Sequence, residues 1–296
     1  MTALALQIGP TRFAAARVAQ DVDADDVREV PIPADGAWDR CLALLKEVAE
    51  GREITALGIA CAGPIDMAAG VVAPAEIAEW RTGFGIVAAA EAAFPGASVY
   101  LAIDGVCSAI AERNLGATKE AMDALALTVS DRISGGITVG GFVVVGRTGN
   151  AGNIGHVLVP GYDEPCACGN RGCLEAVAGG AAAVRWAQGR GWGGSSVDEL
   201  VAAARVKDEV AAAALGRAGT ALGLAIVSTA ALLDLDLAVV GGTMAAAGPA
   251  LWEPLSATVA AHAQLSYLPG LRVVPSTLGD LGGLAGAGLL ALTPRG

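Results

Sequence analysis

The segment 149–175 gathers half of the cysteine and histidine side chains in this sequence, the residue types that bind soft metal ions. Cys166, Cys168 and Cys173 are three of the chain's six cysteines, and His156 is one of its two histidines. One imidazole and three thiolates fill a tetrahedral coordination shell, as in structural zinc, whereas catalytic zinc keeps a position open for water. The segment therefore predicts a structural zinc site. The alternative is a loop whose thiols hold no metal.

Asp104 is the carboxylate best placed in the sequence to act as a general base. It ends the apolar run VYLAID at 99–104 and precedes a segment with helical spacing that Gly116 is expected to close. A carboxylate at a strand end can accept the proton of a hydroxyl group that attacks a phosphoryl group. The local sequence equally allows a structural role in which Asp104 caps the helix that follows.

The remaining candidate residues favour structural roles. The acidic run DVDADDVRE at 21–29 lacks the glycine and terminal glutamate of an EF-hand at the required spacing, so a solvated turn is predicted. His262 is expected on a helix surface or as a hydrogen-bonded histidine. Cys41, Cys61 and Cys107 stand among apolar residues and are expected to be buried thiols.

Composition excludes several classes of protein. Hydrophobic residues make up 54% of the 296 residues and aromatic residues only 4%, which predicts an ordered chain with an aliphatic core. A net charge of −11 disfavours binding to nucleic acid or to an anionic membrane surface. The uncharged stretches 218–233 and 237–252 are each 16 residues long, short of the roughly 18 that a membrane span needs. The N-terminus does not resemble a signal peptide, so we expect a soluble, cytoplasmic protein.

The elements that must position these residues alternate between strands and helices. In the first half, strands are predicted at 4–8, 12–19, 27–32, 54–61 and 99–104, with a helix at 38–51. In the second half we predict a strand at 124–130, a hairpin at 135–146, helices between 174 and 231, a strand at 237–242 and a helix at 281–292. Each half opens with strands around a turn, at 7–11 and at 130–137. This pattern favours two α/β lobes with a cleft between them.

The metal-ligand segment also carries a long motif. Gly152–His156, followed by Cys-x-Cys-Gly-x-x-Gly-Cys-Leu-Glu at 166–175, closely resembles the signature of the ROK family, which includes sugar kinases and repressors. The rest of the chain follows that family's order of elements almost end to end. The resemblance implies an actin-like (ribonuclease H-like) two-lobed ATPase fold. The N-terminal lobe would be 1–116, closed by a C-terminal helix at about 281–296, and 117–280 would form the C-terminal lobe with the zinc loop.

The resemblance also implies roles for individual residues. Asp104 takes the place of the family's base, and a hexose in the cleft would contact Asn153, His156 and Glu175, with His156 using the ring edge that zinc does not engage. ATP with Mg²⁺ would be the phosphoryl donor, and a homodimer or higher oligomer is expected. The candidate nucleotide contacts are Gly9, Thr11, Gly135, Gly136, Gly241 and Gly242.

The sugar side departs from the family's pattern at two positions. Asn153 replaces a glutamate, so a charged acceptor becomes neutral. Ile103 replaces the asparagine before the base, so an amide becomes a hydrocarbon. A buried sugar hydroxyl that faces Ile103 would lose a partner, at a cost on the order of 1–3 kcal/mol. These changes predict an altered ligand.

The phosphate loops depart further. Gln7 replaces an aspartate that the family associates with the metal–nucleotide site, and Pro10 replaces a glycine, which removes a backbone N–H donor. In the second loop, Ser130-Asp131-Arg132 replaces Gly-Thr-Gly, so that Asp131 places a negative charge where phosphates need donors. Arg132 could compensate for that charge, and Asp131 could instead hold Mg²⁺.

Two hypotheses from different classes follow. The first is an ATP-dependent hexose kinase with Asp104 as the base, which the retained aspartate favours. The second is a catalytically impaired relative that binds a sugar or regulates, which Gln7, Pro10 and Asp131 favour. A DNA-binding repressor is not expected, because the sequence begins at the first strand and leaves no room for a helix-turn-helix before it.

Overall fold

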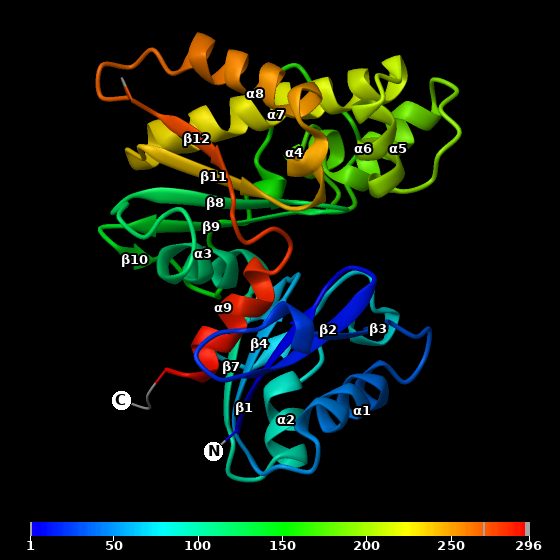
Figure 1. Ribbon diagram of the computed structural model, residues 1–296, viewed down its shortest axis with the longest axis vertical. Helices are drawn as coiled ribbons and strands as arrows, with labels where there is room; N and C mark the ends of the chain where they lie inside the picture. The colour runs from blue at the N-terminus through cyan, green and yellow to red at the C-terminus, as the bar shows by residue number, and fades with distance from the viewer. Residues whose placement is uncertain (1, 269, 294–296) are drawn as a thin grey trace. The chain divides into compact units, whose positions relative to one another are not determined.

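The chain divides into two compact units in the computed structural model, which describes residues 2–268 and 270–293 (Figure 1). Unit 1 comprises Met1–Ala111, Val144–Gly152 and Leu281–Gly296, and unit 2 comprises Glu112–Val143 and Asn153–Asp280. The boundary after Ala111 falls inside helix α3 (Asp104–Asn114). Each unit is an α/β body with its own sheet.

The sheet of unit 1 mixes antiparallel and parallel strands. Its order is β3 (Arg28–Pro31), β2 (Arg12–Val18), β1 (Thr2–Ile8), β4 (Ile54–Cys61) and β7 (Ser98–Ile103). β1, β2 and β3 pair antiparallel, whereas β1, β4 and β7 run parallel. β5 (Ile65–Asp66) and β6 (Val71–Val72) form a separate small hairpin, and η1 (Ala24–Asp26) and η2 (Ala78–Trp80) are single 3₁₀ turns. The parallel strands bring their carboxyl ends to one edge of the sheet.

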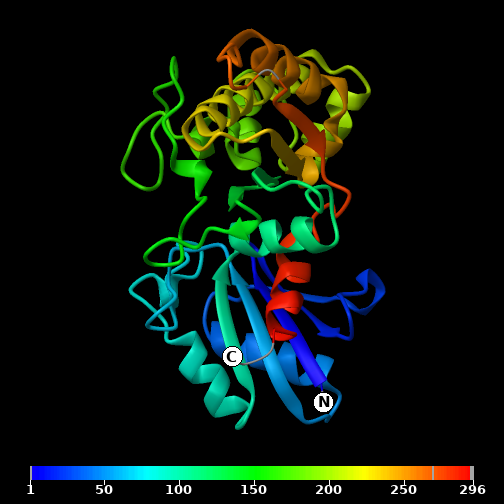
Figure 2. The same cartoon turned by 90° about the vertical axis from the view of Figure 1, so that its left-hand side faces the viewer.

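Three helices pack on this sheet. α1 (Ala37–Ala49) contacts β1 and β2, α2 (Ile86–Ala93) contacts β7, and α9 (Gly282–Ala291) contacts β1 and β4. Figure 2 shows α9, in red, lying along the strands of unit 1. Glycine makes the approach of α9 to β4 possible, because a Cβ at Gly58 would lie 1.8 Å from the Ala287 carbonyl oxygen. At the contact of α9 with α3 (Asp104–Asn114), a Cβ at Gly286 would lie 1.9 Å from the Cys107 carbonyl oxygen.

The sheet of unit 2 repeats the topology of unit 1. Its order is β10 (Phe142–Val143), β9 (Ile133–Val139), β8 (Ala124–Val129), β11 (Leu237–Gly241) and β12 (Arg272–Pro275). The first three strands pair antiparallel, and the last three run parallel. The predicted likeness between the two halves is therefore confirmed at the level of strand order and direction.

The helices of unit 2 pack around one long central helix. They are α4 (Leu174–Ala178), α5 (Gly180–Gln188), α6 (Val197–Arg205), α7 (Glu209–Leu233) and α8 (Pro249–His262), with short 3₁₀ turns η3 (Ile154–His156) and η4 (Thr243–Ala247). Figure 1 shows α7 and α8 side by side. A Cβ at Gly219 would lie 2.3 Å from the Leu251 carbonyl oxygen, so glycine lets the two helices meet. A capping box of Ser196 and Glu199 opens α6.

Helix α7 is long and apolar enough to cross a membrane when judged by length and composition alone. However, 61% of its most apolar 18-residue window is buried inside the protein. It packs against α4, α5, α6 and α8, as the core helix of a globular unit does. The criterion of length is therefore weak evidence for a membrane span.

The structural roles predicted for several residues are confirmed. Cys41, Cys61 and Cys107 are buried free thiols, and burial raises the pKa of Cys41 to about 12. His262 is exposed at the end of α8. The acidic run contains η1, whose residues are exposed.

Candidate functional site

The carboxyl ends of the parallel strands in unit 1 bring three side chains from distant parts of the chain together. Gln7 lies near the end of β1, Cys61 ends β4, and Asp104 follows β7 as the first residue of α3. Both Gln7 and Cys61 interact with the Asp104 carboxyl group. This edge is where ligands bind in open α/β sheets.

The Asp104 carboxyl group is buried and only partly hydrogen-bonded. The side-chain amide of Gln7 donates a hydrogen bond to it. Its Oδ1 atom has no hydrogen-bond partner in the part of the chain that the structure describes. Buried polar atoms are nearly always paired in folded proteins, so an unpaired carboxylate oxygen indicates a functional rather than a structural group.

Burial raises the pKa of Asp104 from its usual 3.8 to about 7, while the hydrogen bond from Gln7 opposes that rise. Desolvation disfavours the ionised form, which explains the direction of the larger effect. A general base works best when its pKa lies near the working pH. The physical state of Asp104 therefore suits proton transfer at neutral pH.

The raised pKa of Asp104 predicts a stability that depends on pH. Between about pH 4 and pH 7 the native state keeps a proton that the unfolded chain has lost, so the free energy of unfolding falls as pH rises through this window. The fall attributable to Asp104 is at most about 4 kcal/mol. Since Asp104→Asn cannot ionise, we expect the variant to gain stability relative to the wild type between pH 5 and pH 8.

Urea unfolding of both proteins at several pH values measures this difference. Protonation of other groups affects both proteins alike, so the difference between them isolates Asp104. Parallel stability curves for the two proteins across this range would show that the pKa of Asp104 is not raised.

Ile103, the last residue of β7, packs against the loop that contains Gly63 at the carboxyl edge of the unit 1 sheet. Its Cδ1 atom would lie 2.8 Å from a Cβ at Gly63, a residue whose φ of +79° suits glycine. Ile103 itself is buried. The hydrocarbon side chain thus packs against the Gly63 backbone, and this position offers no hydrogen bond to a polar ligand.

The turn between β1 and β2 offers few donors to an anion. The Gly9 N–H already donates to the Arg12 carbonyl oxygen at 3.0 Å, and Pro10 has no N–H. Thr11 is exposed. A phosphate-binding loop normally provides free backbone N–H groups. In this turn the Gly9 N–H is already bonded to Arg12, and the replacement of glycine by Pro10 removes another N–H group.

In unit 2 the loops that follow β8 and β11 lie together. Gly241 ends β11, and Gly242 follows with a φ of +90°, where a Cβ would lie 2.6 Å from the Val129 carbonyl oxygen. The next residue, Thr243, donates its N–H to the Ser130 hydroxyl at 3.0 Å, and that hydroxyl donates to the Asp280 carboxylate at 2.8 Å. The glycines thus allow the loops after β8 and β11 to meet.

Gly135 and Gly136 lie elsewhere. Both are buried residues of β9, where they pair with Leu127 and Ala126 of β8. They belong to the interior of the sheet, whereas Gly241 and Gly242 belong to a loop. The two glycine pairs therefore offer different environments to a ligand.

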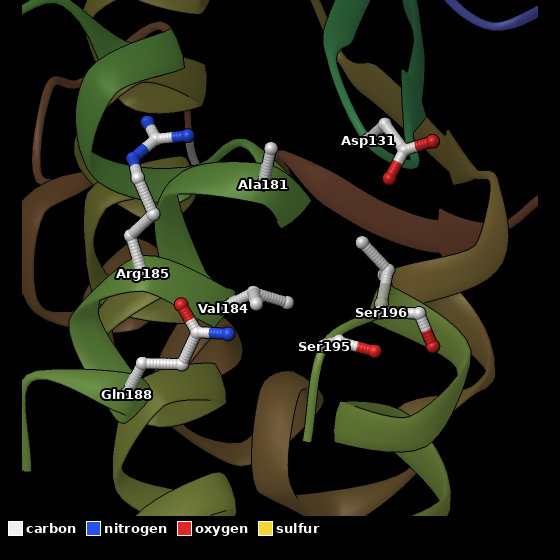
Figure 3. Close-up of a pocket in the computed structure, with 8 residues that line it drawn as sticks. Asp131, Ala181, Val184, Arg185, Gln188, Ser195 and Ser196 are labelled. Atoms are coloured by element: carbon white, nitrogen blue, oxygen red, sulfur yellow. The ribbon is translucent and has the colours of Figure 1, made fainter. Parts of the chain in front are cut away.

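A pocket of about 230 Å³ lies beside the turn that contains Asp131 (Figure 3). Arg185 and Gln188 of α5 line it on one side, and Asp131, Ser195 and Ser196 line it on the other. The α5 helix is fixed to the turn, because the Gly180 and Ala181 N–H groups donate to the carbonyl oxygens of Ser130 and Asp131. The pocket has polar side chains of both charges and is large enough for a planar ring system.

The sugar-side candidates of unit 2 are neighbours. Glu175, near the start of α4, accepts a hydrogen bond from the Ile133 N–H at 2.7 Å and lies 3.5 Å from the Arg132 guanidinium. A Cβ at Gly155 in η3 would lie 3.3 Å from the Glu175 Oε2 atom, which places η3 against this carboxylate. Asn153 directly precedes η3 and His156 ends it, and Asn153 makes no side-chain capping bond to η3.

Arg132 and burial together affect His156. Desolvation and then the positive charge of Arg132 lower the pKa of His156 below 6.5. Its imidazole is therefore neutral at neutral pH, the form in which histidine binds a metal ion.

The predicted metal ligands converge. The ligand atoms of His156, Cys166, Cys168 and Cys173 all lie within 4.8 Å of one another. The His156 Nδ1 and Cys166 Sγ atoms are 3.8 Å apart, and the Cys168 and Cys173 Sγ atoms are 3.7 Å apart. A tetrahedron with zinc–sulfur bonds of about 2.3 Å has sulfur–sulfur edges of about 3.8 Å. The donor set and its spacing fit zinc, with the Nδ1 atom of His156 facing Cys166.

Several residues at these sites were not singled out from the sequence. Asn150 pairs with the backbone of Ile65 through both amide atoms, at 2.7 and 3.0 Å, and so ties the segment 144–152 to unit 1. Arg185 and Gln188 of the pocket lie in an alanine-rich helix without a distinguishing motif. Asp131, in the predicted turn at 130–137, is the residue of this pocket that the sequence had indicated as a candidate.

The chain is similar to known proteins over nearly its whole length. The sequence profile of the ROK family matches residues 3–293. The chain is 28% identical to the glucokinase of Thermotoga maritima, over 96% of this chain and 95% of that protein. It is 32% identical to the kanosamine kinase of Amycolatopsis mediterranei, over 81% of this chain and 78% of that protein.

A solved structure extends the similarity to three dimensions. A ROK family glucokinase from Streptomyces griseus, crystallised with glucose and AMPPNP, superposes with a TM-score of 0.85 at 28% identity, over 98% of this chain and 99% of that one. This agreement confirms the predicted fold class, the actin-like ATPase fold.

Proposed function

Because this chain belongs to the ROK family, we propose that it is a sugar kinase that transfers the γ-phosphoryl group of ATP to a hexose hydroxyl with Asp104 as the base. The observation that carries the proposal is the buried Asp104 carboxyl group, whose Oδ1 atom has no hydrogen-bond partner within the described residues. Such an atom can accept a hydrogen bond from a substrate hydroxyl. Relatives named as glucokinase and kanosamine kinase support the reaction class.

In the proposed reaction, Asp104 takes the proton of the sugar hydroxyl. The hydroxyl oxygen forms a bond to the γ-phosphorus, and the bond between that phosphorus and the β,γ-bridging oxygen breaks. The products are a sugar phosphate and ADP. At pH 7 a base with a pKa of about 7 is half ionised, which favours both accepting and releasing the proton.

We assign sugar contacts to Asn153, His156 and Glu175. Glu175 is held in place by the Ile133 N–H at its Oε2 atom and by Arg132 at its Oε1 atom, so a sugar hydroxyl would share an oxygen that already has a protein partner. His156 would use its Nε2 edge, since Nδ1 faces Cys166. The amide of Asn153 could accept and donate hydrogen bonds without adding charge.

For the nucleotide we assign the loops of unit 2. The pocket beside Asp131 would take the base, with the Gln188 amide as a hydrogen-bonding group and the planar Arg185 guanidinium as a stacking surface. Gly241 and Gly242 would permit close approach of the nucleotide to the loop after β11. ATP would bring Mg²⁺, and Asp131 is the carboxylate we assign as a candidate for holding that ion.

Two further assignments accompany the kinase. A structural zinc held by His156, Cys166, Cys168 and Cys173 would fix the loop that carries His156 close to Glu175. We expect the protein to act in the cytoplasm as a homodimer or a higher oligomer.

The alternative is a sugar-binding or regulatory protein with impaired catalysis. It is favoured by the β1–β2 turn, where the Gly9 N–H is committed to Arg12 and Pro10 provides no donor. A turn with so few free N–H groups would hold ATP phosphates weakly.

A coupled assay for ADP release against a panel of hexoses and amino sugars tests the proposal. The panel includes glucose, N-acetylmannosamine and kanosamine as acceptors, with ATP and polyphosphate as alternative donors. We expect Asp104-dependent turnover with at least one sugar. If calorimetry detects sugar binding but no combination gives turnover, the kinase proposal is wrong and the sugar-binding role replaces it.

A further inference from the structure

Gln7, near the carboxyl end of β1, lies beside the Asp104 carboxyl group. Its Nε2 atom and the Asp104 Oδ1 atom border the same point of α9, where a Cβ at Gly283 would lie 2.5 Å from the first and 3.4 Å from the second. A hydrogen bond from Gln7 lowers the pKa of Asp104, against the effect of burial. A donor in this place restricts the plane of the carboxyl group and the direction of its free lone pairs.

Helix α9 approaches the Gln7 amide closely at Gly283. A Cβ at this position would lie 2.5 Å from the Gln7 Nε2 atom and 3.4 Å from the Asp104 Oδ1 atom. Glycine therefore leaves room for the amide, which a larger residue would displace, whereas the carboxyl group would be in ordinary contact. The sequence thus provides three matched features, a donor on β1, an acceptor on α3 and a gap in α9.

The two thiols that interact with Asp104 carry no charge near neutral pH. They belong to Cys61 on β4 and Cys107 on α3, and burial raises the pKa of both cysteines. The carboxyl group of Glu76, in the loop after β6, acts on Cys61. α9 meets this contact at Gly283. A hydrogen bond from Gln7 opposes the effect of desolvation on the pKa of Asp104.

We propose that Gln7 is a positioning residue that orients the Asp104 carboxyl group and stabilises its ionised form. This inference rests on the proposed role of Asp104 as the base. It also gives a physical meaning to Gln7, which stands where the family pattern has an aspartate. An ionised carboxylate at position 7 would oppose ionisation of Asp104, whereas an amide N–H favours it.

Three variants distinguish the loss of the Gln7 donor, the addition of a negative charge and the displacement of the amide. Gln7→Leu removes the donor at similar size, and Gln7→Glu removes the donor and adds a negative charge. Gly283→Ala leaves Gln7 intact but displaces its amide, because the new Cβ occupies the 2.5 Å gap. Gln264→Leu, an exposed position on unit 2, makes the same chemical change away from Asp104 and serves as the control.

Titration of ¹³C-aspartate-labelled protein by NMR reads the pKa of Asp104 directly and needs no turnover, with Asp104→Asn identifying the signal. We expect the pKa to rise by about one unit in Gln7→Leu, by more in Gln7→Glu, and also in Gly283→Ala. The acidic limb of the kcat/KM profile should move to higher pH by the same amount. Gln264→Leu should change neither quantity. Circular dichroism and zinc content confirm folding of each variant.

The outcomes of the two proposals can be told apart. An Asp104 pKa that stays at its wild-type value in Gln7→Leu and Gly283→Ala would overturn the positioning role, whatever the activity. If the pKa of Asp104 rises in these variants but the acidic limb of the kcat/KM profile does not move, the proposed effect of Gln7 on catalysis is wrong. If the wild type phosphorylates no sugar while the NMR shift is present, the proposed function fails and the pairing of Gln7 with Asp104 stands.

Discussion

Asp104→Asn is expected to lower kcat for sugar phosphorylation by about 10³-fold, within the range of 10²–10⁴ that general-base catalysis supplies. The amide keeps the shape of the carboxyl group but cannot take up a proton. Since Asp104 Oδ1 has no protein partner among the described residues, the substitution breaks no hydrogen bond at that atom. We therefore expect a loss of rate without a comparable loss of structure.

The measurement is ADP release under saturating sugar and ATP, with sugar affinity determined separately by calorimetry. We expect the dissociation constant for sugar to change by less than about tenfold, because the variant retains the hydrogen-bonding shape of the site. Asp66→Asn is the matched control, since Asp66 is an exposed carboxylate of the same unit that accepts a hydrogen bond from the Ala69 N–H. It should keep the wild-type rate.

Retention of more than a tenth of the wild-type kcat by Asp104→Asn would contradict the assignment of the base. In that case the buried carboxyl group would have a structural function, and its unpaired oxygen would need another explanation. A large loss in both kcat and sugar affinity would instead indicate that the carboxyl group binds the sugar in the ground state.

The second large effect concerns the predicted zinc site. Elemental analysis of the purified protein should find about one zinc per chain, and Cys168→Ser should lose it. We expect the loss to lower the free energy of unfolding by about 4 kcal/mol or more, because a metal that binds only the folded state stabilises it in proportion to its affinity. Cys168 is exposed, so the thiol itself contributes little packing.

Cys41→Ala provides the control for this experiment. Cys41 is a buried thiol of unit 1 that takes no part in the ligand cluster, so the variant should lose some packing energy but keep its zinc. Urea unfolding with and without a chelator measures both quantities. A wild-type protein that is folded, zinc-free and unaffected by added zinc would show that the four ligands hold no structural metal.

The local sequence was sufficient to predict most elements of the fold. A hydrophobic run predicted β4 at 54–61 with its bounds. The paired strand patterns predicted two related halves, which the two sheets confirm. These features depend on neighbours within a few residues, so the sequence alone can specify them.

The sequence also identified Asp104 and the metal ligands as candidates, because their residue types and spacing carry the chemistry. His156 and the three cysteines lie close together in the chain, and the structure places their ligand atoms within 4.8 Å of one another. A strand followed by a helix was enough to place Asp104 at the edge of a sheet.

Only the tertiary structure decided which side chains from distant parts of the sequence contact one another. It placed the Gln7 amide on Asp104, the Arg132 guanidinium beside Glu175, and Asn150 on the backbone of Ile65. It also placed Gly135 and Gly136 inside β9, although a glycine pair in sequence is equally compatible with a loop. Each of these results depends on strand register or helix packing between segments far apart in the chain. No local pattern encodes such contacts, because they arise only when the whole sheet and its covering helices are in place.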